Sequence, residues 1–504
     1  MSSAERFWLG VALALGVFVR LLPVLGAAAA VGDGGLIHSM IDDVRAAGLA
    51  IPSETSYNSL DIPFVYPPGA IWVAAALGEA TNVATLDLLR WLPLLLSIAV
   101  LGAFAWLAWR VLPPVAAIGA ALAYALMPHA YDWVIAGGGL TRGAGLLAAL
   151  VAMTLAAGRP PASRWEPALA GAALGVAFLT HPQAAIFGTM GCLVLSWQSP
   201  AGRWARNAAL AGVVALAIVV PWLVAVVAAH GADALLSPGN RFEPLTGLIR
   251  LGNLRFSGAP FMDVFAVFGA VGVLAATVRG PRRVTLLLVL TYLAGAGGGE
   301  FLAAAPWALA GGIGLDALVR VVALDERPAA HRALFTAATG LALFLALIGS
   351  FGSVADGSSK LHSLDTSHLE AMAWLADNAD TDARVIVPVA GVWGDDEVSE
   401  WLPALGQRHS VGTVQGSEWL GVAGFETQLA THNAIRDCDG STVACYAAID
   451  PEAVIFIPKG QLAGPFSPGD CCPALRQTLA DSGYRIVYDE AGATIAEPAR
   501  SDDG

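Results

Sequence analysis

Long apolar runs recur along this chain from Phe7 to Phe351, and they restrict its fold more than any other feature of the sequence. A helix needs roughly 20 apolar residues to cross the hydrocarbon core of a bilayer, and several runs reach that length. Of the 504 residues, 56% are hydrophobic and only 13% are charged. A soluble protein with a very large buried core is the alternative, but these proportions favour a polytopic membrane protein.

Roughly 11 of these runs are predicted to span the membrane as α-helices. The first is interpreted as a retained helix, because it lacks the small-residue cleavage site of a signal peptide. The predicted spans are Phe7–Ala30, Leu86–Trp109, Val115–Met127, Leu140–Ala157, Ala168–Leu179, Gln183–Trp197, Ala208–Ala229, Phe261–Val278, Val284–Gly295, Phe301–Val322 and Ala333–Phe351.

The arginines set the predicted orientation. Arginine is enriched in cytoplasmic loops, so the N-terminus and alternate loops are assigned to the cytoplasm. This alternation works only if Pro67–Leu77 does not span, and that segment is predicted to lie in the plane of the outer leaflet. The outer loop 31–85 and the C-terminal tail are then extracytoplasmic. The arginines assigned inside are Arg110, Arg159, Arg164, Arg203, Arg206, Arg279, Arg282, Arg283, Arg327 and Arg332.

Two domains are predicted, a multi-pass transmembrane domain over residues 1–354 and an extracytoplasmic α/β domain over residues 355–504. In the second, Ser367–Ala376 has the apolar spacing of an amphipathic helix. This domain holds 23 of the 40 acidic residues, and so acidic a surface argues against nucleic acid as a partner. Its strands are predicted at Arg384–Val389, Ala453–Pro458, Tyr484–Tyr488 and Ala493–Ala496, with a helix at Pro473–Ser482.

Four of the five cysteines lie in the tail, which is the side predicted to be oxidising. Four cysteines allow three pairings. Because a bridge between the neighbours Cys471 and Cys472 would be strained, each is expected to pair with Cys438 or Cys445. A metal site built from these thiols is the less favoured alternative, and Cys192 is expected to pack inside a span.

The outer loop carries the polar residues of greatest interest. Asp33 lies on a glycine-flanked turn directly above the first span, where a carboxylate is costly to place. Several arginines also lie at or near the outer face, against the positive-inside bias, and such arginines can hold a phosphate bidentately. Snorkelling to lipid headgroups is the alternative for any single one. The outer arginines are Arg45, Arg90, Arg142, Arg241, Arg250 and Arg255.

Two further polar groups are interpreted as surface. His38 and Asp42 lie four residues apart on a predicted helix and could bind a metal, but an exposed polar face explains them better. The acidic run Asp395, Asp396, Glu397 and Glu400 is likewise interpreted as solvated surface. The sequence has no Gly-x4-Gly-Lys-Ser/Thr phosphate loop, no His-Glu-x-x-His zinc motif and no Gly-x-Ser-x-Gly nucleophile elbow.

The order of motifs in the first hundred residues resembles one known superfamily. A membrane helix is followed by Gly-Asp-Gly at Gly32–Gly34, and then by a predicted helix that ends in Arg-Ala-Ala-Gly at Arg45–Gly48. Next come Tyr66-Pro67-Pro68, an in-plane apolar segment, and Arg-Trp-Leu-Pro at Arg90–Pro93. This order, with a soluble C-terminal domain on the outer face, resembles the GT-C membrane glycosyltransferases such as protein mannosyltransferases, aminoarabinose transferases and oligosaccharyltransferases.

The resemblance implies roles for particular residues. Asp33 matches the acid that acts as the base on the acceptor, and Asp42 or Asp43 could be a second acid of the family. Tyr66 matches the segment near the lipid phosphate, where relatives often carry a lysine or histidine. Tyr66 cannot supply that charge, so Arg90 or Arg142 would have to. His181, in Thr180-His181-Pro182 at an outer helix end, is expected to bind substrate. The tail has no Trp-Trp-Asp motif, which weakens the oligosaccharyltransferase reading.

The resemblance therefore implies a cell-envelope hexosyl- or pentosyltransferase with a polyprenyl-phosphate-linked sugar as donor. The acceptor hydroxyl, on a lipid, a glycan or a protein, would lose its proton to a carboxylate and displace the lipid phosphate with inversion. Arginines or a divalent cation, Mg or Mn, would stabilise the departing phosphate. A noncatalytic scaffold with the same fold and a lipid or solute transporter are the alternatives, although no internal repeat supports a transporter.

Overall fold

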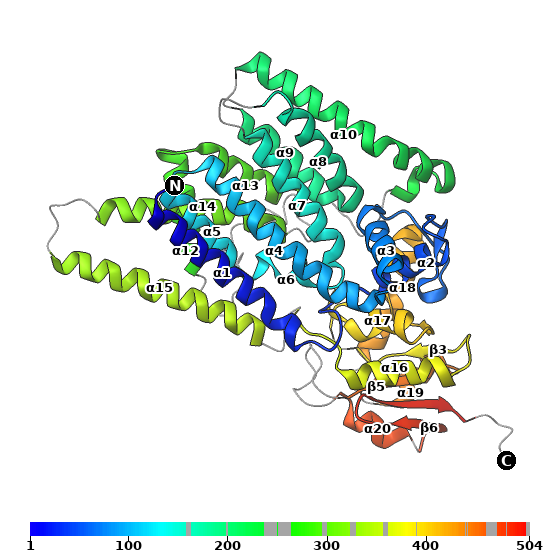
Figure 1. Ribbon diagram of the computed structural model, residues 1–504. Coiled ribbons are helices and arrows are strands. Elements are labelled where there is room, and N and C mark those ends of the chain that lie inside the picture. Colours follow the sequence, from blue (N-terminus) through cyan, green and yellow to red (C-terminus); the bar gives the residue numbers. More distant parts are fainter. Residues whose placement is uncertain are drawn as a thin grey trace.

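The computed structural model describes a helical membrane domain and a smaller mixed domain that contains the C-terminus (Figure 1). The residues described are 1–157, 163–197, 200–235, 249, 264–294, 300–322, 329–355, 361–389, 391–438, 440, 442–459, 471–479 and 481–499.

Each predicted span coincides with a helix over most of its described residues, and the first differs most, because its helix ends at Gly26 and not at Ala30. Six of the helices are long and apolar enough to cross a membrane, namely α1, α4, α7, α10, α14 and α15, whereas the count of eleven spans stays a prediction. The helices are α1 (Ser3–Gly26), α4 (Thr85–Val111), α5 (Pro114–Leu126), α7 (Gly139–Ala156), α8 (Glu166–Thr180), α9 (Pro182–Ser196), α10 (Ala201–His230), α12 (Val264–Val278), α13 (Arg282–Ala294), α14 (Glu300–Val322) and α15 (Ala329–Ala355).

Local chemistry sets the start and the interior contacts of α1. A capping box begins the helix, because the Ser2 hydroxyl accepts a hydrogen bond from the Glu5 amide and the Glu5 carboxylate accepts one from Ser2. Arg20 is fully buried in the same helix. Its guanidinium donates to the Ser97 hydroxyl at 3.0 Å and to the Ala125 carbonyl at 2.9 Å, so the buried charge is hydrogen-bonded between α1, α4 and α5.

The outer loop forms a small layer between the membrane helices and the tail (Figure 1). It contains α2 (Gly35–Ala46), the short antiparallel strands β1 (Glu54–Thr55) and β2 (Ile62–Pro63), and α3 (Gly69–Thr81). The apolar helix α3 packs against α2, and its orientation in the plane of the membrane stays a prediction.

The tail is built around a five-stranded sheet with strand order β4-β3-β5-β7-β6. β3 (Arg384–Ile386) pairs in parallel with β4 (His409–Ser410) and β5 (Val454–Pro458), while β7 (Ala493–Pro498) is antiparallel to β5 and β6 (Tyr484–Asp489). The predicted strands and both predicted helices are confirmed, and β4 is additional. The helices of the tail are α16 (Thr366–Asn378), α17 (Glu397–Leu405), α18 (Gly421–Asp437), α19 (Val443–Ile449) and α20 (Pro473–Leu479).

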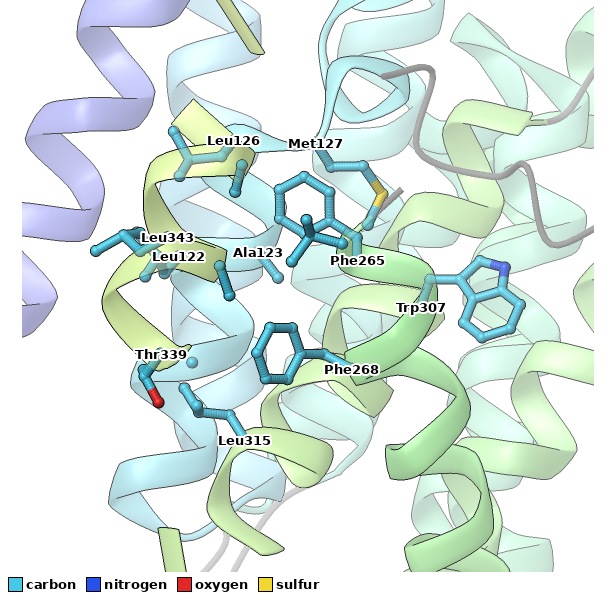
Figure 2. Close-up of a pocket in the computed structure, with 15 residues that line it drawn as sticks. Leu122, Ala123, Leu126, Met127, Phe265, Phe268, Trp307, Leu315, Thr339 and Leu343 are labelled. Carbon is cyan, nitrogen blue, oxygen red and sulfur yellow. The ribbon is translucent and has the colours of Figure 1, made fainter. Parts of the chain in front are cut away.

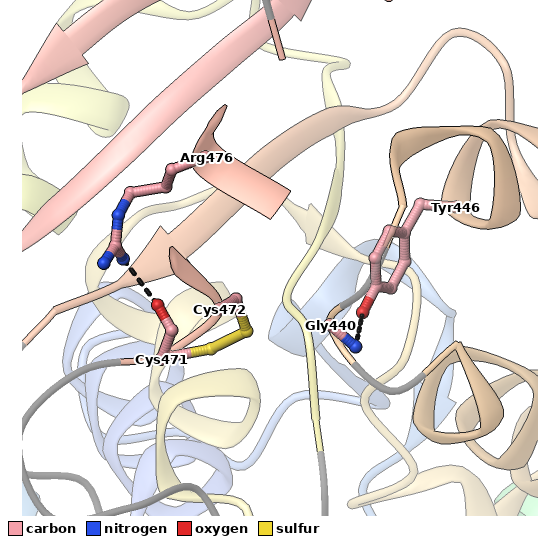
Figure 3. The surroundings of a disulfide bond; sticks show 5 residues. All are labelled: Gly440, Tyr446, Cys471, Cys472 and Arg476. Atoms are coloured by element: carbon pink, nitrogen blue, oxygen red, sulfur yellow. Dashed lines mark hydrogen bonds between the residues drawn. A yellow bond between two sulfur atoms is a disulfide. The ribbon is translucent and has the colours of Figure 1, made fainter. Parts of the chain in front are cut away.

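The predicted cysteine pairing is wrong. Cys438 pairs with Cys445, and Cys471 pairs with its neighbour Cys472. The chain reverses between α18 and α19 at Gly440, whose φ of 61° suits glycine, and this reversal leaves the Cα atoms of Cys438 and Cys445 5.7 Å apart. Figure 3 shows the Gly440 amide donating to the Tyr446 hydroxyl at 3.0 Å near the second disulfide. The local turn therefore decides the pairing.

The tail is joined to the membrane domain through α17 and the glycine-rich turn after α1. Trp401, with no exposed surface, donates from its indole nitrogen to the Gly32 carbonyl at 2.8 Å. On the other side of the contact, the Tyr57 hydroxyl donates to the Glu400 carbonyl at 2.7 Å. A Cβ added at Gly35 would lie 2.2 Å from that same carbonyl oxygen, so the backbones of the two domains are in direct contact there.

We expect Gly35→Ala to weaken this contact. The added methyl group would force α2 and α17 apart, at a cost of about 1–3 kcal/mol. Limited proteolysis and thermal unfolding of the detergent-solubilised protein measure the effect. Gly10→Ala is the matched control, because a Cβ at Gly10 meets nothing within 4 Å. Equal protease resistance and equal unfolding temperatures for the two variants would contradict the prediction.

Candidate functional site

The turn that carries Asp33 is held by backbone contacts on both sides. Gly32 has a φ of 60° and Gly34 a φ of 150°, conformations that favour glycine, which explains why the acid is flanked by them. The segment before α7 is hydrogen-bonded to the turn. The Gly137 amide donates to the Val31 carbonyl at 2.7 Å, and the Gly138 amide donates to the Asp33 carbonyl at 2.9 Å. Asp33 is therefore fixed between the ends of α1 and α7.

Asp33 and Arg142 form a close ion pair. The Nη2 of Arg142 donates to Oδ1 at 2.6 Å and to Oδ2 at 2.8 Å, and the two side chains are only 15–16% exposed. The Gly138 amide donates to Oδ1 at 3.2 Å. Arg142 is oriented in turn by the Trp133 carbonyl, which accepts from Nε at 2.9 Å, and its guanidinium lies over the Trp133 ring. These contacts hold the carboxylate in one orientation.

Tyr66 and His181 lie next to this pair. The Tyr66 hydroxyl is 2.9 Å from Oγ1 of Thr141 and 3.3 Å from Nδ1 of His181. Burial raises the pKa of Tyr66, and the charges of Arg142, Asp33 and Glu418 also act on it. The Nε2 of His181 is buried and has no hydrogen-bond partner among the described residues. Four of the predicted site residues, Asp33, Arg142, Tyr66 and His181, are thus brought together.

The tail contributes an acid that the sequence analysis interpreted as solvated surface. Glu400 is only 7% exposed, and its carboxylate accepts a hydrogen bond from the Gly34 amide at 3.0 Å. Burial raises the pKa of Glu400 well above its usual value, and the negative charge of Asp33 raises it further. The interpretation as surface is wrong because α17 packs its Glu400 face against α2 and the Asp33 turn.

A second tail acid lies close to the same group of residues. Glu418 belongs to the short 3-10 helix Ser417–Trp419, and its Oε2 is buried without a hydrogen-bond partner among the described residues. Burial raises the pKa of this carboxyl to about 7, although the backbone amides of Glu418 and Gly416 act in the opposite direction. The adjacent Trp419 ring packs edge-to-face on Tyr66, with 6.4 Å between the ring centroids.

The other predicted site residues have partners elsewhere. Asp42 accepts from Thr85 and lies 3.4 Å from His38, while Asp43 accepts from Thr55 and Ser56 within the outer loop. In the described structure neither has a contact with the Asp33 pair.

The other outer arginines also have partners away from the pair. Arg90 donates to the Val24 carbonyl at 3.2 Å and lies over the Trp91 ring, and Arg45 donates to Val83 and Thr85. Arg241, Arg250 and Arg255 lie outside the described residues.

An apolar cavity of about 110 Å³ lies deeper in the membrane domain, between α5, α12, α14 and α15. Figure 2 shows Phe265 and Phe268 of α12 projecting towards α5, with Trp307 of α14 beside them. The helix α14 links this cavity to the site, because Phe301 packs on the His181 ring at 5.8 Å. Trp307 follows six residues later in the sequence, about 9 Å along the helix axis.

Solved structures provide the comparison that decides the fold. ArnT of Cupriavidus metallidurans, bound to undecaprenyl phosphate, is similar with a TM-score of 0.59 and 16% identity over 98% of each chain. The oligosaccharyltransferase AglB of Archaeoglobus fulgidus, with an inhibitory peptide and a dolichol-phosphate, has a TM-score of 0.53 and 14% identity. That match covers 82% of this chain and 64% of AglB.

The arabinofuranosyltransferase AftD from mycobacteria is also similar, with a TM-score of 0.53 and 18% identity over 100% of this chain and 40% of AftD. All three are GT-C membrane glycosyltransferases. This chain has the GT-C fold. No protein-family model and no curated protein matches the sequence. The likeness lies in the three-dimensional structure, at identities that establish the fold alone.

Within this GT-C fold, the donor set does not fit a metal ion. Asp33 is paired with Arg142, and Glu400 accepts from the Gly34 amide. Among the described residues, no three His, Cys, Asp or Glu side chains are grouped so that they could hold one. The function proposed below therefore uses no metal.

The titration of Glu418 should be visible in the stability of the protein. Its pKa lies near 7 in the folded protein and near 4.5 in the unfolded chain, so the folded state holds the proton more tightly between these values. Stability should then fall as the pH rises from about 4.5 to 7, by an amount of the order of 3 kcal/mol.

We expect Glu418→Gln to reduce this loss between pH 5 and pH 8, measured as the shift in unfolding temperature in detergent. Glu426→Gln, at an exposed position of α18, is the control and should behave like the unmodified protein. The same pH dependence in all three proteins would show that the Glu418 pKa is not raised.

Proposed function

We propose that the protein is a membrane glycosyltransferase that moves a hexosyl or pentosyl group from a polyprenyl-phosphate-linked donor to an acceptor hydroxyl at the outer face. The observation that carries the proposal is the Asp33–Arg142 pair, fixed between the membrane helices and the tail in a GT-C fold. The similar ArnT and AglB structures hold undecaprenyl phosphate and a dolichol-phosphate, which supports a lipid phosphate as the donor's carrier.

Asp33 acts as the general base. Its carboxylate takes the proton of the acceptor hydroxyl while the hydroxyl oxygen forms a bond to the anomeric carbon. The bond between that carbon and the phosphate oxygen breaks, and its electron pair leaves with the lipid phosphate. A direct displacement of this kind inverts the anomeric configuration. The glycine-flanked turn supports this role, because Gly32 and Gly34 adopt positive φ values that fix the backbone on both sides of Asp33.

Arg142 stabilises the charge that develops on the phosphate. In the described structure its Nε donates to Trp133 and its Nη2 donates to Asp33, which leaves the two N–H groups of Nη1 for another acceptor. Arginine binds phosphate oxygens through such planar pairs of donors. Arg142 would thus contact the base and the leaving group at once. The acceptor hydroxyl at Asp33 and the lipid phosphate of the donor would then lie on either side of one guanidinium.

His181 is proposed to contact the donor. The Thr141 hydroxyl donates to the Gly138 carbonyl at 3.1 Å, so its contact with Tyr66 requires Tyr66 to donate. Nδ1 of His181 then donates to the Tyr66 oxygen, and in a neutral imidazole Nε2 becomes an acceptor. This buried nitrogen is suited to accept a hydrogen bond from a hydroxyl of the donor sugar.

We expect Asp33→Asn to lower transfer by about 100- to 10,000-fold, because the amide keeps the shape of the side chain but cannot take the proton. Transfer from a panel of polyprenyl-phosphate sugars by the purified protein, scored together with hydrolysis, gives the measurement. Binding of the donor should survive the substitution. Asp42→Asn is the matched control, because Asp42 lies on α2 away from the pair. Near-full activity in Asp33→Asn, with loss in Asp42→Asn, would move the role of base to Asp42.

The apolar cavity is proposed to receive part of the polyprenyl chain. Gly311 lines the cavity, and a Cβ at this position would make an ordinary contact of 3.7 Å with Ala123, so a larger side chain would extend into the cavity. We expect Gly311→Leu to lower transfer from a long-chain donor about 10-fold, equivalent to about 1.4 kcal/mol of lost apolar burial.

A donor with only two isoprene units should be affected much less. Gly102→Leu is the control for the cavity, because Gly102 is exposed on α4 and a Cβ there meets nothing within 4 Å. An equal loss of transfer with both donors, or an equal effect of both variants, would show that the cavity does not bind the polyprenyl chain of the donor.

A further inference from the structure

The tail forms one wall of the site with the segment around Glu418. Trp419 packs on Tyr66, and a Cβ added at Gly416 would lie 2.8 Å from Ile62, so this segment is seated directly on the outer loop. Gly416 has a φ of 85°, which turns the chain just before Glu418. The wall is therefore fixed against the same loop that presents Tyr66 to His181.

Two carboxylate oxygens of the tail lack a hydrogen-bond partner among the described residues, one in this wall and one at the start of α17. They are Oε2 of Glu418 and Oδ2 of Asp396, and both are buried. The other oxygen of Asp396 accepts from the Ser399 amide at 3.2 Å at the start of α17. A buried oxygen without a hydrogen-bond donor costs about 1–3 kcal/mol, and that cost is recovered when a ligand donates to it.

The two carboxylates belong to one region. Burial raises the pKa of Tyr57 well above its usual value, and the charges of Glu400, Glu418 and Asp396 raise it further. Glu418 also acts on the Tyr66 hydroxyl together with Arg142 and Asp33. Glu418 therefore lies near Tyr66, next to the Asp33–Arg142 pair.

The lysine and arginine side chains of the described part of the tail have partners away from this wall. Arg384 pairs with Asp450, Lys459 with Asp489 and Arg485 with Glu497. The other arginines of the described tail also have partners elsewhere. Arg408 donates to the carbonyls of Ala376 and Ala379. Arg436 pairs with Asp437, and Arg476 donates to the Cys471 carbonyl. An acceptor that carries phosphate or carboxylate groups would thus meet the carboxylates of the tail, and Arg142, the guanidinium beside them, is already paired with Asp33.

We propose that the acceptor is an uncharged glycan, with sugar hydroxyls that donate to Glu418 and Asp396 and one sugar face against Trp419. Hydroxyl groups supply hydrogen-bond donors without bringing a charge into the site, and an aromatic ring offers an apolar face to a sugar. The raised pKa of Glu418 agrees with a neutral ligand, since a hydroxyl can meet this carboxyl in either protonation state. This inference rests on the proposed transferase function.

Binding of the acceptor can be measured apart from transfer. The full-length protein in nanodiscs is titrated with neutral manno- and arabino-oligosaccharides, with a phosphorylated manno-oligosaccharide and with a chitosan oligosaccharide that carries amines, and the dissociation constants are compared. We expect a neutral oligosaccharide to bind most tightly. Glu418→Gln and Trp419→Ala should each weaken its binding about 10-fold, the effect of losing one hydrogen bond to a charged group or one ring contact.

The same variants should bind undecaprenyl phosphate as the unmodified protein does, and the exposed Glu426→Gln should change neither affinity. Tighter binding of the phosphorylated or the amine-bearing oligosaccharide, or no binding of any oligosaccharide, would overturn the inference even if transfer to another hydroxyl occurs. Binding of neutral oligosaccharides that depends on Glu418, without transfer from any donor, would support the acceptor site and count against the transferase.

Discussion

The glycine-rich turn after α1 is held from the tail by two hydrogen bonds, and the rest of the site depends on them. Trp401 donates to the Gly32 carbonyl, and the Gly34 amide donates to Glu400, so the residue between these glycines is fixed from the far end of the chain. The segment before α7 holds the same turn from the other side through Gly137 and Gly138. Asp33 is thereby positioned by two domains, and neither domain alone contains a complete site.

The electrostatics of the site follow from this arrangement. One guanidinium, that of Arg142, faces a group of carboxylates contributed by both domains, and the tail acids Glu400 and Glu418 are buried at the cost of raised pKa values. Desolvation disfavours the charged forms of these acids. Such costs are tolerated where charge and hydrogen bonding serve a ligand, and carboxyl groups with shifted pKa values are typical of functional sites.

The membrane domain was predictable from the sequence because a span needs only local information. Apolar length located the described helices of the membrane domain, and the glycine-flanked Asp33 was recognisable within a short motif. Glu400 and Glu418 were not recognisable as site residues, because an acid next to apolar residues is equally typical of an amphipathic surface helix. Their burial depends on contacts with residues about 350 positions away, as the hydrogen bond between Glu400 and Gly34 shows with a separation of 366. The cysteine pairing failed for the opposite reason, because a local turn at Gly440 outweighed the general rule against bridging neighbours.

The sequence separation of 366 residues between Gly34 and Glu400 also has a consequence for biosynthesis. Chains are synthesised at about 5–20 residues per second, so Glu400 is added roughly 20–70 s after Gly34. During that interval the first helices can insert into the membrane, but the turn that holds Asp33 lacks its contacts from α17. A nascent chain on the ribosome therefore contains Asp33 without the tail contacts that hold its turn, and the assembled site arises only when α17 folds against that turn.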